Sequence, residues 1–197
     1  MTPLLLIGCG GHARALIDLI ETTRQWQIHG LVGLPEQMGS QVLGYSVVGT
    51  DAQLKELRQQ CDSAVLAVGQ LADPLPRRRL ARNLHELAFQ TPVLISPHAH
   101  VSRHALIGSG TVVNHGVIVN AGAVVGAHCI INSRALIEHD VQIGEHCHIS
   151  TGALINGGVS VGPGSFIGSG AMLREGLEIP PGSVISAGKR VMGWPLL

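Results

Sequence analysis

The chain has 197 residues, of which 45% are hydrophobic, 13% are charged and only 3% are aromatic. Its 13 basic residues balance 13 acidic residues, which excludes the broad positive surface of a nucleic-acid-binding protein. The low charge content and high hydrophobicity exclude the composition of a disordered chain. No stretch approaches the ~20 apolar residues of a membrane helix. The opening residues lack the basic segment of a secretory signal, so we expect a cytoplasmic protein whose thiols stay reduced.

The first part of the chain alternates strand and helix patterns. We expect strands at 4–7, 28–34, 46–48 and 64–68, and helices at 12–24, 51–60 and 77–88. This alternation is typical of a parallel, Rossmann-like sheet, here in a small α/β domain that spans residues 1–92. Pro92 and Pro97 bracket the point where a different pattern begins, so we place a second domain at 93–197.

A glycine-rich turn, Gly8-Cys9-Gly10-Gly11-His12-Ala13, joins the first strand to the first helix. It fits G-x-G-x-x-A, in which glycines let backbone amides approach a phosphate at a helix N-terminus. A NAD site would also place an acidic residue about 20 positions further on. His29, Gly33 and Leu34 stand there instead. We therefore favour the phosphate of a nucleotide sugar over NAD, and a purely structural turn stays open.

Four arginines fall on the third expected helix, at Arg77, Arg78, Arg79 and Arg82. A run of like charges on a helix is usually a solvated face, which we expect here. A phosphate contact stays open for one of the four.

An aliphatic residue recurs at every sixth position from Ile95 to Val191 without a break. A period of six fits neither a strand nor a helix, and hexapeptide repeats indicate a parallel β-helix. Three short strands per coil give a triangular prism of about 18 residues per turn, with coils about 4.8 Å apart. The residue four positions after each aliphatic is usually small. The residue directly after each aliphatic is often Gly or Asn, and we interpret these residues as the ones that adopt positive φ at tight corners.

Two of the four cysteines, Cys129 and Cys147, lie 18 positions apart in the same inward phase. We expect them to stack as small core residues, because a disulfide or a metal site is unusual for such thiols in a reducing compartment.

His139 is the strongest candidate for chemistry among the 11 histidines. Acyl transfer from a thioester needs a base, and histidine suits this near neutral pH. His139 lies two positions after the inward Ile137, so it faces outward, and it is flanked by Glu138 and Asp140. A neighbouring carboxylate fixes the tautomer of an imidazole and raises its basicity. One coil later Gly157 leaves a bare backbone amide beside the imidazole, where it can face an oxyanion.

We expect the other histidines to be less central. They comprise His85 on a helix surface, His98, His100 and His104 at the first turn of the prism, His115 and His128 facing outward at a subunit seam, His146 exposed, and His148 near the next corner.

The hexapeptide pattern resembles that of the hexapeptide-repeat acyltransferases, whose prisms are left-handed and usually form trimers with active sites between neighbouring subunits. With the preceding Gly-x-Gly-Gly-His-Ala-Arg domain, the chain is similar to the sialic acid O-acetyltransferase and UDP-4-amino-sugar N-acetyltransferase family of bacterial surface-sugar biosynthesis. The motif of that family, Asn-x-x-x-x-x-Glu-His and an acidic residue, stands here at Asn132 to Asp140. The resemblance implies a homotrimeric enzyme that acetylates an amino or hydroxyl group of a sugar with acetyl-CoA, without a metal.

The resemblance also implies roles for individual residues. His139 is implied as the general base, Asp140 as the group that raises its basicity, and the Gly157 amide as the oxyanion donor. The implied coenzyme contacts are His148, which meets the thioester region, and Ser169 and Ala187, which line the groove. The implied contacts to the sugar nucleotide are Gly11, His12, Ala13, Gly69 and Asn132.

Two departures from the family are visible. Gly33-Leu34 stands where the family often has two acidic residues for the nucleotide base, so the acceptor and its nucleotide are left open. The end Met192-Gly193-Trp194-Pro195 resembles the family's Gly-x-Pro-Ala tail, with Leu196 in place of the alanine.

Two alternatives remain at this stage. One is a prism that binds a sugar nucleotide and coenzyme A without catalysis. The other is a zinc lyase of the prism-shaped carbonic anhydrase type, which needs three outward histidines at a trimer seam. That type includes a histidine pair five residues apart, a spacing that this chain lacks.

Overall fold

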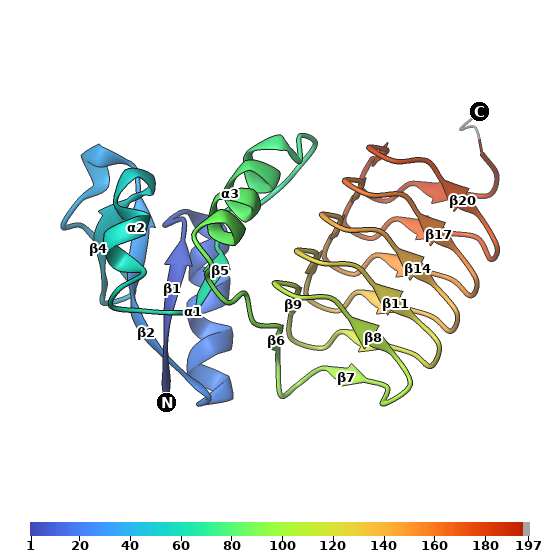
Figure 1. Cartoon of the computed structure of the whole chain (residues 1–197). Helices are drawn as coiled ribbons and strands as arrows, with labels where there is room; N and C mark the ends of the chain where they lie inside the picture. Colours follow the sequence, from blue (N-terminus) through green and yellow to red (C-terminus); the bar gives the residue numbers. More distant parts are fainter. Residues whose placement is uncertain (195–197) are drawn as a thin grey trace. The chain divides into compact units, whose positions relative to one another are not determined.

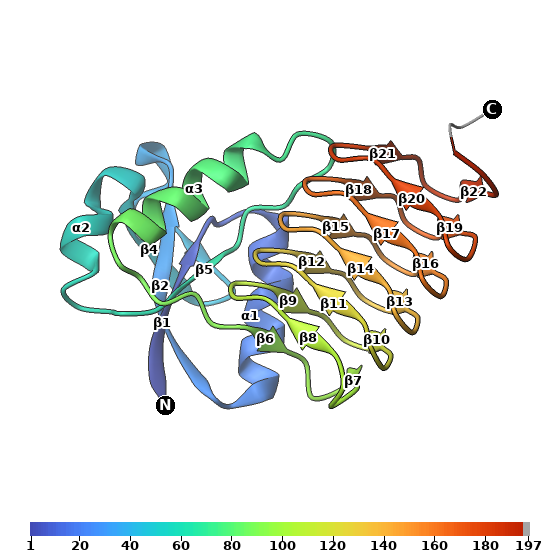
Figure 2. The same cartoon turned by 45° about the vertical axis from the view of Figure 1, so that its right-hand side comes forward.

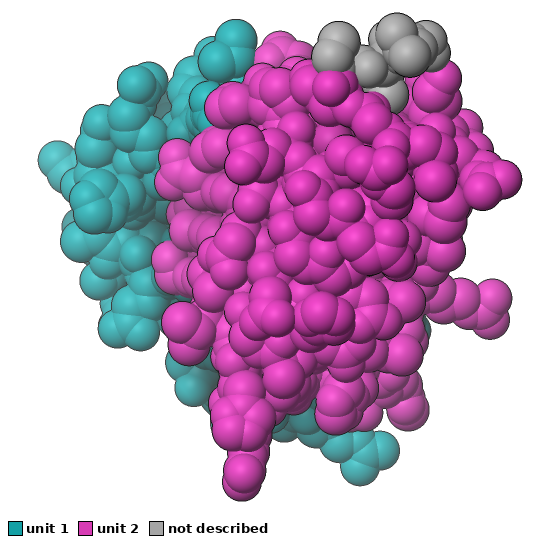
Figure 3. Space-filling view, turned by 90° about the vertical axis from the view of Figure 1, so that its right-hand side faces the viewer, with its two compact units in different colours: residues 1–69, 75–92 teal, residues 70–74, 93–197 magenta. Residues whose placement is uncertain are grey.

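The computed structural model describes residues 1–194, which fall into two compact units (Figures 1 and 3). Unit 1 comprises Met1–Gly69 and Leu75–Pro92, and unit 2 comprises Gln70–Pro74 and the chain from Val93 onward. The tail positions Pro195 and Leu196 lie outside the described residues. None of the helices in the described part is long and apolar enough to cross a membrane.

Unit 1 is an α/β fold with the sheet order β3-β4-β2-β1-β5. The strands are β1 (Thr2–Ile7), β2 (Trp26–Gly33), β3 (Gln41–Val42), β4 (Tyr45–Thr50) and β5 (Ala64–Leu66). The helices are α1 (Gly11–Thr23), α2 (Leu54–Leu57) and α3 (Leu75–Glu86), with short 3₁₀ turns η1 (Pro35–Gln37) and η2 (Asp51–Gln53). β1, β2, β4 and β5 pair in parallel, which confirms the Rossmann-like expectation.

Two local features of unit 1 differ from the sequence expectation. β3 pairs antiparallel with β4, because Leu43 (φ 50) and Gly44 (φ 87) form a tight two-residue hairpin turn. The helix expected at 51–60 is divided into η2 and α2 and ends at Leu57. Beyond it the chain continues as turns, in which Gln60 N–H bonds the carbonyl of Leu57 three residues earlier.

The arginine-rich face of α3 also differs from the expectation. Arg77 is only 1% exposed, and its Nη1 donates to the carbonyls of Leu66 and Val68 at the end of β5. It shares the buried face of α3 with Leu80, so it braces the sheet rather than facing solvent. Arg79 and Arg82 are exposed, as expected for a solvated face.

Unit 2 is a left-handed parallel β-helix with three faces, and Figure 2 shows its coils stacked along the prism. The first face holds β6 (Leu94–Ile95), β9 (Val112–Val113), β12 (Ile130–Ile131), β15 (His148–Ile149), β18 (Phe166–Ile167) and β21 (Val184–Ile185). The second holds β7 (His100–Val101), β10 (Ile118–Val119), β13 (Leu136–Ile137), β16 (Leu154–Ile155), β19 (Met172–Leu173) and β22 (Arg190–Val191). The third holds β8 (Leu106–Ile107), β11 (Val124–Val125), β14 (Gln142–Ile143), β17 (Ser160–Val161) and β20 (Glu178–Ile179).

The register between coils is constant, as the period of six requires. Ile118 pairs with Leu136 and Leu136 with Leu154, so each coil contains 18 residues. We call the turn that follows a first-face strand corner A, the turn after a second-face strand corner B, and the turn after a third-face strand corner C. Every outward side chain can therefore be assigned to one face or one corner from its number alone.

The prism core is aliphatic and thin, which explains the scarcity of aromatic residues. The residues of the sixfold ladder between Val113 and Val191 are at most 3% exposed, and the small residues four positions later fill the space between them. Cys129 and Cys147 are buried thiols in consecutive coils and form no disulfide with each other, as predicted. Their Sγ–H groups donate to the carbonyls of Gly144 and Gly162, each at 3.2 Å.

The corner glycines correct the expectation about positive φ. The left-handed conformation occurs three residues after each inward aliphatic, at every sixth position from Gly110 to Gly188. The glycines directly after the aliphatic have another role. A Cβ at Gly126 would lie 2.5 Å from the backbone nitrogen of Glu145 in the next coil, and one at Gly144 would lie 2.6 Å from that of Pro163. These glycines let adjacent coils approach closely.

This distinction can be tested by comparing Gly126→Ala with Gly170→Asn. Gly170 has φ +64 with open space around it, and asparagine tolerates that conformation. We expect Gly126→Ala to lower the free energy of unfolding by about 1–3 kcal/mol through overpacking against rigid backbone. Gly170→Asn should cost less than about 1 kcal/mol. Urea unfolding of both variants measures this, and equal losses would contradict the assignment.

Candidate active site

His139 lies at corner B, on the turn that follows β13. Its side chain is 66% exposed, and its Nδ1 lies 2.9 Å from Oδ2 of Asp140. Asp140 adopts the left-handed conformation with φ 60, which turns its carboxylate back toward the imidazole. The hydrogen bond to Asp140, followed by the charges of Asp140 and Glu138, raises the pKa of His139 above its usual 6.5. With Nδ1 held by the carboxylate, Nε2 is the nitrogen that can accept a proton.

Two glycines make room for this pair. A Cβ at Gly157 would lie 2.6 Å from Nε2 of His139, and a Cβ at Gly122 would lie 2.4 Å from Oδ1 of Asp140. Only glycine fits at either place without displacing the pair. The neighbouring Gly158 N–H bonds the His139 carbonyl at 3.0 Å, whereas the Gly157 N–H has no backbone partner within residues 1–194. The backbone of Gly157 therefore lies against the His139 ring on the side of Nε2.

Glu138 stabilises the turn that carries His139 and Asp140 by accepting two hydrogen bonds. Its Oε2 accepts a hydrogen bond from Nδ2 of Asn120 at 2.9 Å and one from the His139 backbone N–H at 3.3 Å. Sequence analysis did not identify Asn120 as a partner of Glu138. The spacing of 18 residues, which places Asn120 beside Glu138 in the preceding coil, could have predicted this contact.

The predicted coenzyme residues gather at and beside corner A. Ser169 and Ala187 are exposed and stack in consecutive coils, joined by the Gly188 N–H to Ser169 carbonyl bond at 2.8 Å. His148 begins β15 on the adjoining first face and is only 7% exposed. Asn132, predicted as a sugar contact, lies at corner A too, with Nδ2 3.3 Å from His148 Nε2.

Corners A and B lie at opposite edges of the second face, which comprises β7 to β22. One prism therefore does not bring His139 together with His148, Asn132, Ser169 or Ala187. The predicted site residues of the prism therefore fall into two separate groups.

The predicted sugar-nucleotide residues of unit 1 do come together. Gly11, His12 and Ala13 form the first turn of α1, and a Cβ at Gly69 would lie 3.7 Å from the Cβ of His12. A cavity of about 310 Å³ opens at the carboxyl ends of β1, β2 and β5. It lies where the strand order reverses, which is the usual ligand position in an open α/β sheet. Its lining includes Gly8, Gly10, Gly33, Gln37 and Arg79.

Neutral groups occupy the end of β2 in that cavity. Gln37 Oε1 accepts hydrogen bonds from the Leu34 N–H at 2.8 Å and from the Cys9 Sγ–H at 3.1 Å. A Cβ at Gly33 would lie 3.0 Å from the Cys9 sulfur, so a larger residue there would press on the Cys9 and Gln37 side chains. The end of β2 thus presents the amide of Gln37, whereas the family often has two acidic residues at this place.

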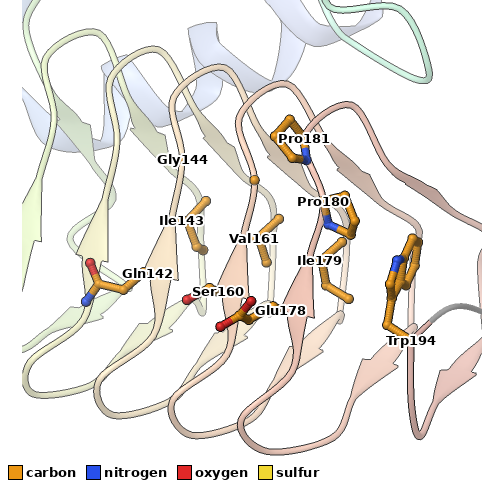
Figure 4. Close-up of a pocket in the computed structure, with 11 residues that line it drawn as sticks. Gln142, Ile143, Gly144, Ser160, Val161, Glu178, Ile179, Pro180, Pro181 and Trp194 are labelled. Atoms are coloured by element: carbon orange, nitrogen blue, oxygen red, sulfur yellow. The ribbon is translucent and has the colours of Figure 1, made fainter.

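A groove of about 580 Å³ runs along the third face of the prism (Figure 4). It begins at Gln142, three residues after His139, and passes Ser160 and Glu178 in the next two coils. Trp194 closes its far end beside Pro180. The groove therefore leads away from the coil that carries His139, and sequence analysis did not identify it.

The remaining histidines follow the expectation with one exception. His85, His98, His100 and His104 are exposed, and His115 and His128 are half-buried. His146 was expected to be exposed but is only 8% exposed. Its ring stacks on that of His128, with centroids 5.2 Å apart and planes at 12°, because the two residues occupy the same corner position in consecutive coils. Residues 1–194 contain no group of three or more side chains arranged to hold a metal ion.

Comparison with known families gives two matches. Residues 3–84 match the PglD N-terminal domain, and residues 122–157 match the bacterial transferase hexapeptide family with its six repeats. A comparison with curated proteins finds no match.

Solved structures match nearly the whole chain. The acetyltransferase domain of PglB from Neisseria gonorrhoeae FA1090, in complex with acetyl coenzyme A, is 33% identical over 94% of this chain and 88% of that chain, with a TM-score of 0.86. A histidine-to-asparagine mutant of perosamine N-acetyltransferase from Caulobacter crescentus, in complex with CoA and GDP-perosamine, is 31% identical over 98% and 91%, with a TM-score of 0.90. WeeI from Acinetobacter baumannii AYE, 18% identical over 95% of both chains with a TM-score of 0.75, shares the fold.

The Asp140–His139 pair can be tested by titration. Replacing Asp140 with Asn removes the negative charge and the strongest cause of the raised pKa, so the pKa of His139 should fall toward 6.5. NMR titration of the imidazole C–H resonance measures this shift directly. Glu145→Gln removes an exposed carboxylate at corner C and should leave the titration of His139 unchanged. An unaltered pKa in the Asp140→Asn protein would contradict the assigned pairing.

Proposed function

This chain belongs to the hexapeptide-repeat family of sugar acetyltransferases, and we propose that His139 is its general base. The protein is an acetyl-CoA-dependent acetyltransferase. The observation that supports the site assignment is the exposed imidazole of His139, which is held by Asp140 at Nδ1 and lies against the backbone of Gly157 at Nε2. The solved perosamine relative with a replaced histidine is consistent with a histidine at the centre of the reaction.

The geometry supports direct transfer of the acetyl group. The amine of the acceptor attacks the thioester carbonyl, and Nε2 of His139 takes the proton that the amine loses. The Gly157 N–H donates to the oxyanion that forms on the carbonyl oxygen. When the intermediate collapses, the carbon–sulfur bond breaks, and the proton held by His139 passes to the departing thiolate. The carboxylate of Asp140 stabilises the imidazolium between these two steps.

We assign the acceptor to the class of sugars linked to a nucleotide, with an amino group as the first choice and a hydroxyl as the second. The Caulobacter relative is solved with GDP-perosamine, an amino sugar on a nucleotide. The cavity at the carboxyl ends of β1, β2 and β5 is the place proposed for the nucleotide. Its lining includes Gly10 and Val68, the chain neighbours of the predicted Gly11 and Gly69. Unit 1 would thus bind the sugar nucleotide, and the prism would bind acetyl-CoA and carry the chemistry.

The separation of corners A and B supports a site shared between copies of the chain. We propose a homotrimer in which corner B of one subunit faces corner A of its neighbour. The coenzyme would then lie between the third-face groove of the first subunit and Ser169 and Ala187 of the second. Asn132 and His148 would approach the thioester from the second subunit.

We also propose a cytoplasmic location. The four cysteines, which include the stacked Cys129 and Cys147, are in the thiol form, the usual state in a reducing compartment.

The base assignment predicts a large kinetic defect. His139→Ala should lower kcat by about 10²- to 10⁴-fold, because the acceptor loses its proton acceptor in the transition state. Turnover of acetyl-CoA with a panel of UDP-, dTDP- and GDP-linked amino sugars measures this. His104→Ala, which removes an exposed imidazole near the first coil, should retain normal turnover. A normal kcat for His139→Ala would refute the base. If acetyl-CoA raises the melting temperature of the unaltered chain but no acceptor is acetylated, the prism binds without catalysis.

A shared site predicts complementation between two inactive chains. His139→Ala disables corner B, and Ala187→Trp fills corner A. In a random mixed trimer about one quarter of the interfaces join an intact corner B to an intact corner A. Co-expression of the two variants should therefore restore a corresponding fraction of turnover. A chain that carries both substitutions should stay inactive, and failure of the mixture to recover would place the whole site within one chain.

A further inference from the structure

Gln70 is a buried amide in the segment Gln70–Pro74, which belongs to the prism unit. It is 3% exposed, and its Nε2 donates to the carbonyl of His146 at 3.0 Å and to that of Gly164 at 3.5 Å. These two carbonyls occupy the same position of corner C in consecutive coils. The side chain of Gln70 therefore fixes its own main chain against the prism.

The main-chain carbonyl of Gln70 meets His148. This carbonyl lies within hydrogen-bond distance of Nδ1 of His148. A carbonyl oxygen can only accept, so Nδ1 must carry a proton. His148 is 7% exposed, and its ring packs edge-on against Phe166 with centroids 5.2 Å apart, so it has little freedom to rotate away.

The second ring nitrogen of His148, Nε2, must be unprotonated so that it can accept a hydrogen bond. It lies 3.3 Å from Nδ2 of Asn132. The orientation of the Asn132 amide is fixed, because its Oδ1 accepts from the Ser133 backbone N–H at 2.8 Å and from Nδ2 of Asn114 at 3.4 Å. Nδ2 therefore faces His148, and an amide NH₂ can only donate. Only the neutral imidazole with its proton on Nδ1 satisfies both partners.

From this network we propose that Gln70 is a positioning residue that acts through His148 to orient the amide of Asn132 toward the coenzyme. One N–H of Asn132 is used on His148. The other is assigned to a carbonyl oxygen of acetyl-CoA, either that of the thioester or that of the nearest pantetheine amide. This inference rests on the proposed coenzyme side of the site at corner A.

The same network changes the role of His148. Its Nδ1 proton is donated to Gln70, and its Nε2 lone pair is occupied by Asn132. It therefore has no proton to give to the departing thiolate. His148 is therefore a positioning residue too. His139 both accepts the proton of the amine and delivers it to the departing thiolate.

The tautomer can be observed without any substrate. In ¹⁵N-histidine-labelled protein, long-range ¹⁵N–¹H NMR spectra should show His148 with Nδ1 protonated and Nε2 unprotonated. Gln70→Glu keeps the length of the side chain but turns its donors into acceptors that face two carbonyls. We expect this variant to release the main-chain carbonyl and to populate the form of His148 protonated on Nε2. Leu71→Ala, at the exposed neighbouring position, is the matched control and should leave the spectrum unchanged.

A second variant keeps the Gln70 anchor intact. Asn132→Asp replaces the donor beside Nε2 with an acceptor, so Nε2 of His148 should gain a proton. If Gln70→Glu fails to fold, this variant still decides whether the amide fixes the tautomer. A protonated Nε2 in the unaltered protein would overturn the proposal, as would an unchanged tautomer in either variant.

Kinetics separate positioning from chemistry. Gln70→Glu should raise KM for acetyl-CoA about 10-fold, the usual effect of losing one well-placed hydrogen bond, with a smaller change in kcat. A loss in kcat with an unchanged KM would overturn the coenzyme-side role of Gln70. If no acceptor is turned over at all, the proposed function fails, but the tautomer measured by NMR still stands or falls independently.

Discussion

The geometry around His139 depends on the 18-residue register of the stacked coils. Backbone hydrogen bonds between neighbouring coils hold each residue beside the residue one coil later, and no insertion interrupts this order between Ile95 and Val191. Gly157 lies over His139 for this reason, and the amide of Asn114 reaches that of Asn132 for the same reason. Corner B, with its imidazole and glycine, is thus built by the same regularity that builds the core.

That regularity also explains why the fold and part of the site could be predicted from the sequence. In a strictly periodic chain, the number of a residue determines its place in a coil. The β-helix fold, the outward orientation of His139 and the position of Gly157 one coil later could therefore be inferred from spacing. Asp140 could be assigned to His139 because neighbours on one turn meet regardless of tertiary context. The α/β unit was predictable to the level of its elements, because strands and helices there carry distinct apolar patterns.

The features that were missed involve contacts outside the period. Gln70 bonds residues 76 and 94 positions away, and no spacing rule connects a linker to a coil. The burial of Arg77 depends on which side of α3 faces the sheet, and a run of arginines obscures that side. The corner glycines were assigned the wrong role, because sequence cannot distinguish a glycine needed for its φ from one needed for close approach.

The unbroken register has a consequence for how such a protein can change its length. Adding or removing one residue within the prism would turn inward side chains outward in all later coils. Viable length changes must come in whole coils, so the separation between His139 and Trp194 along the prism axis varies only in increments of about 4.8 Å. A groove along a face of the prism, such as the one that ends at Trp194, can therefore lengthen or shorten only by whole coils.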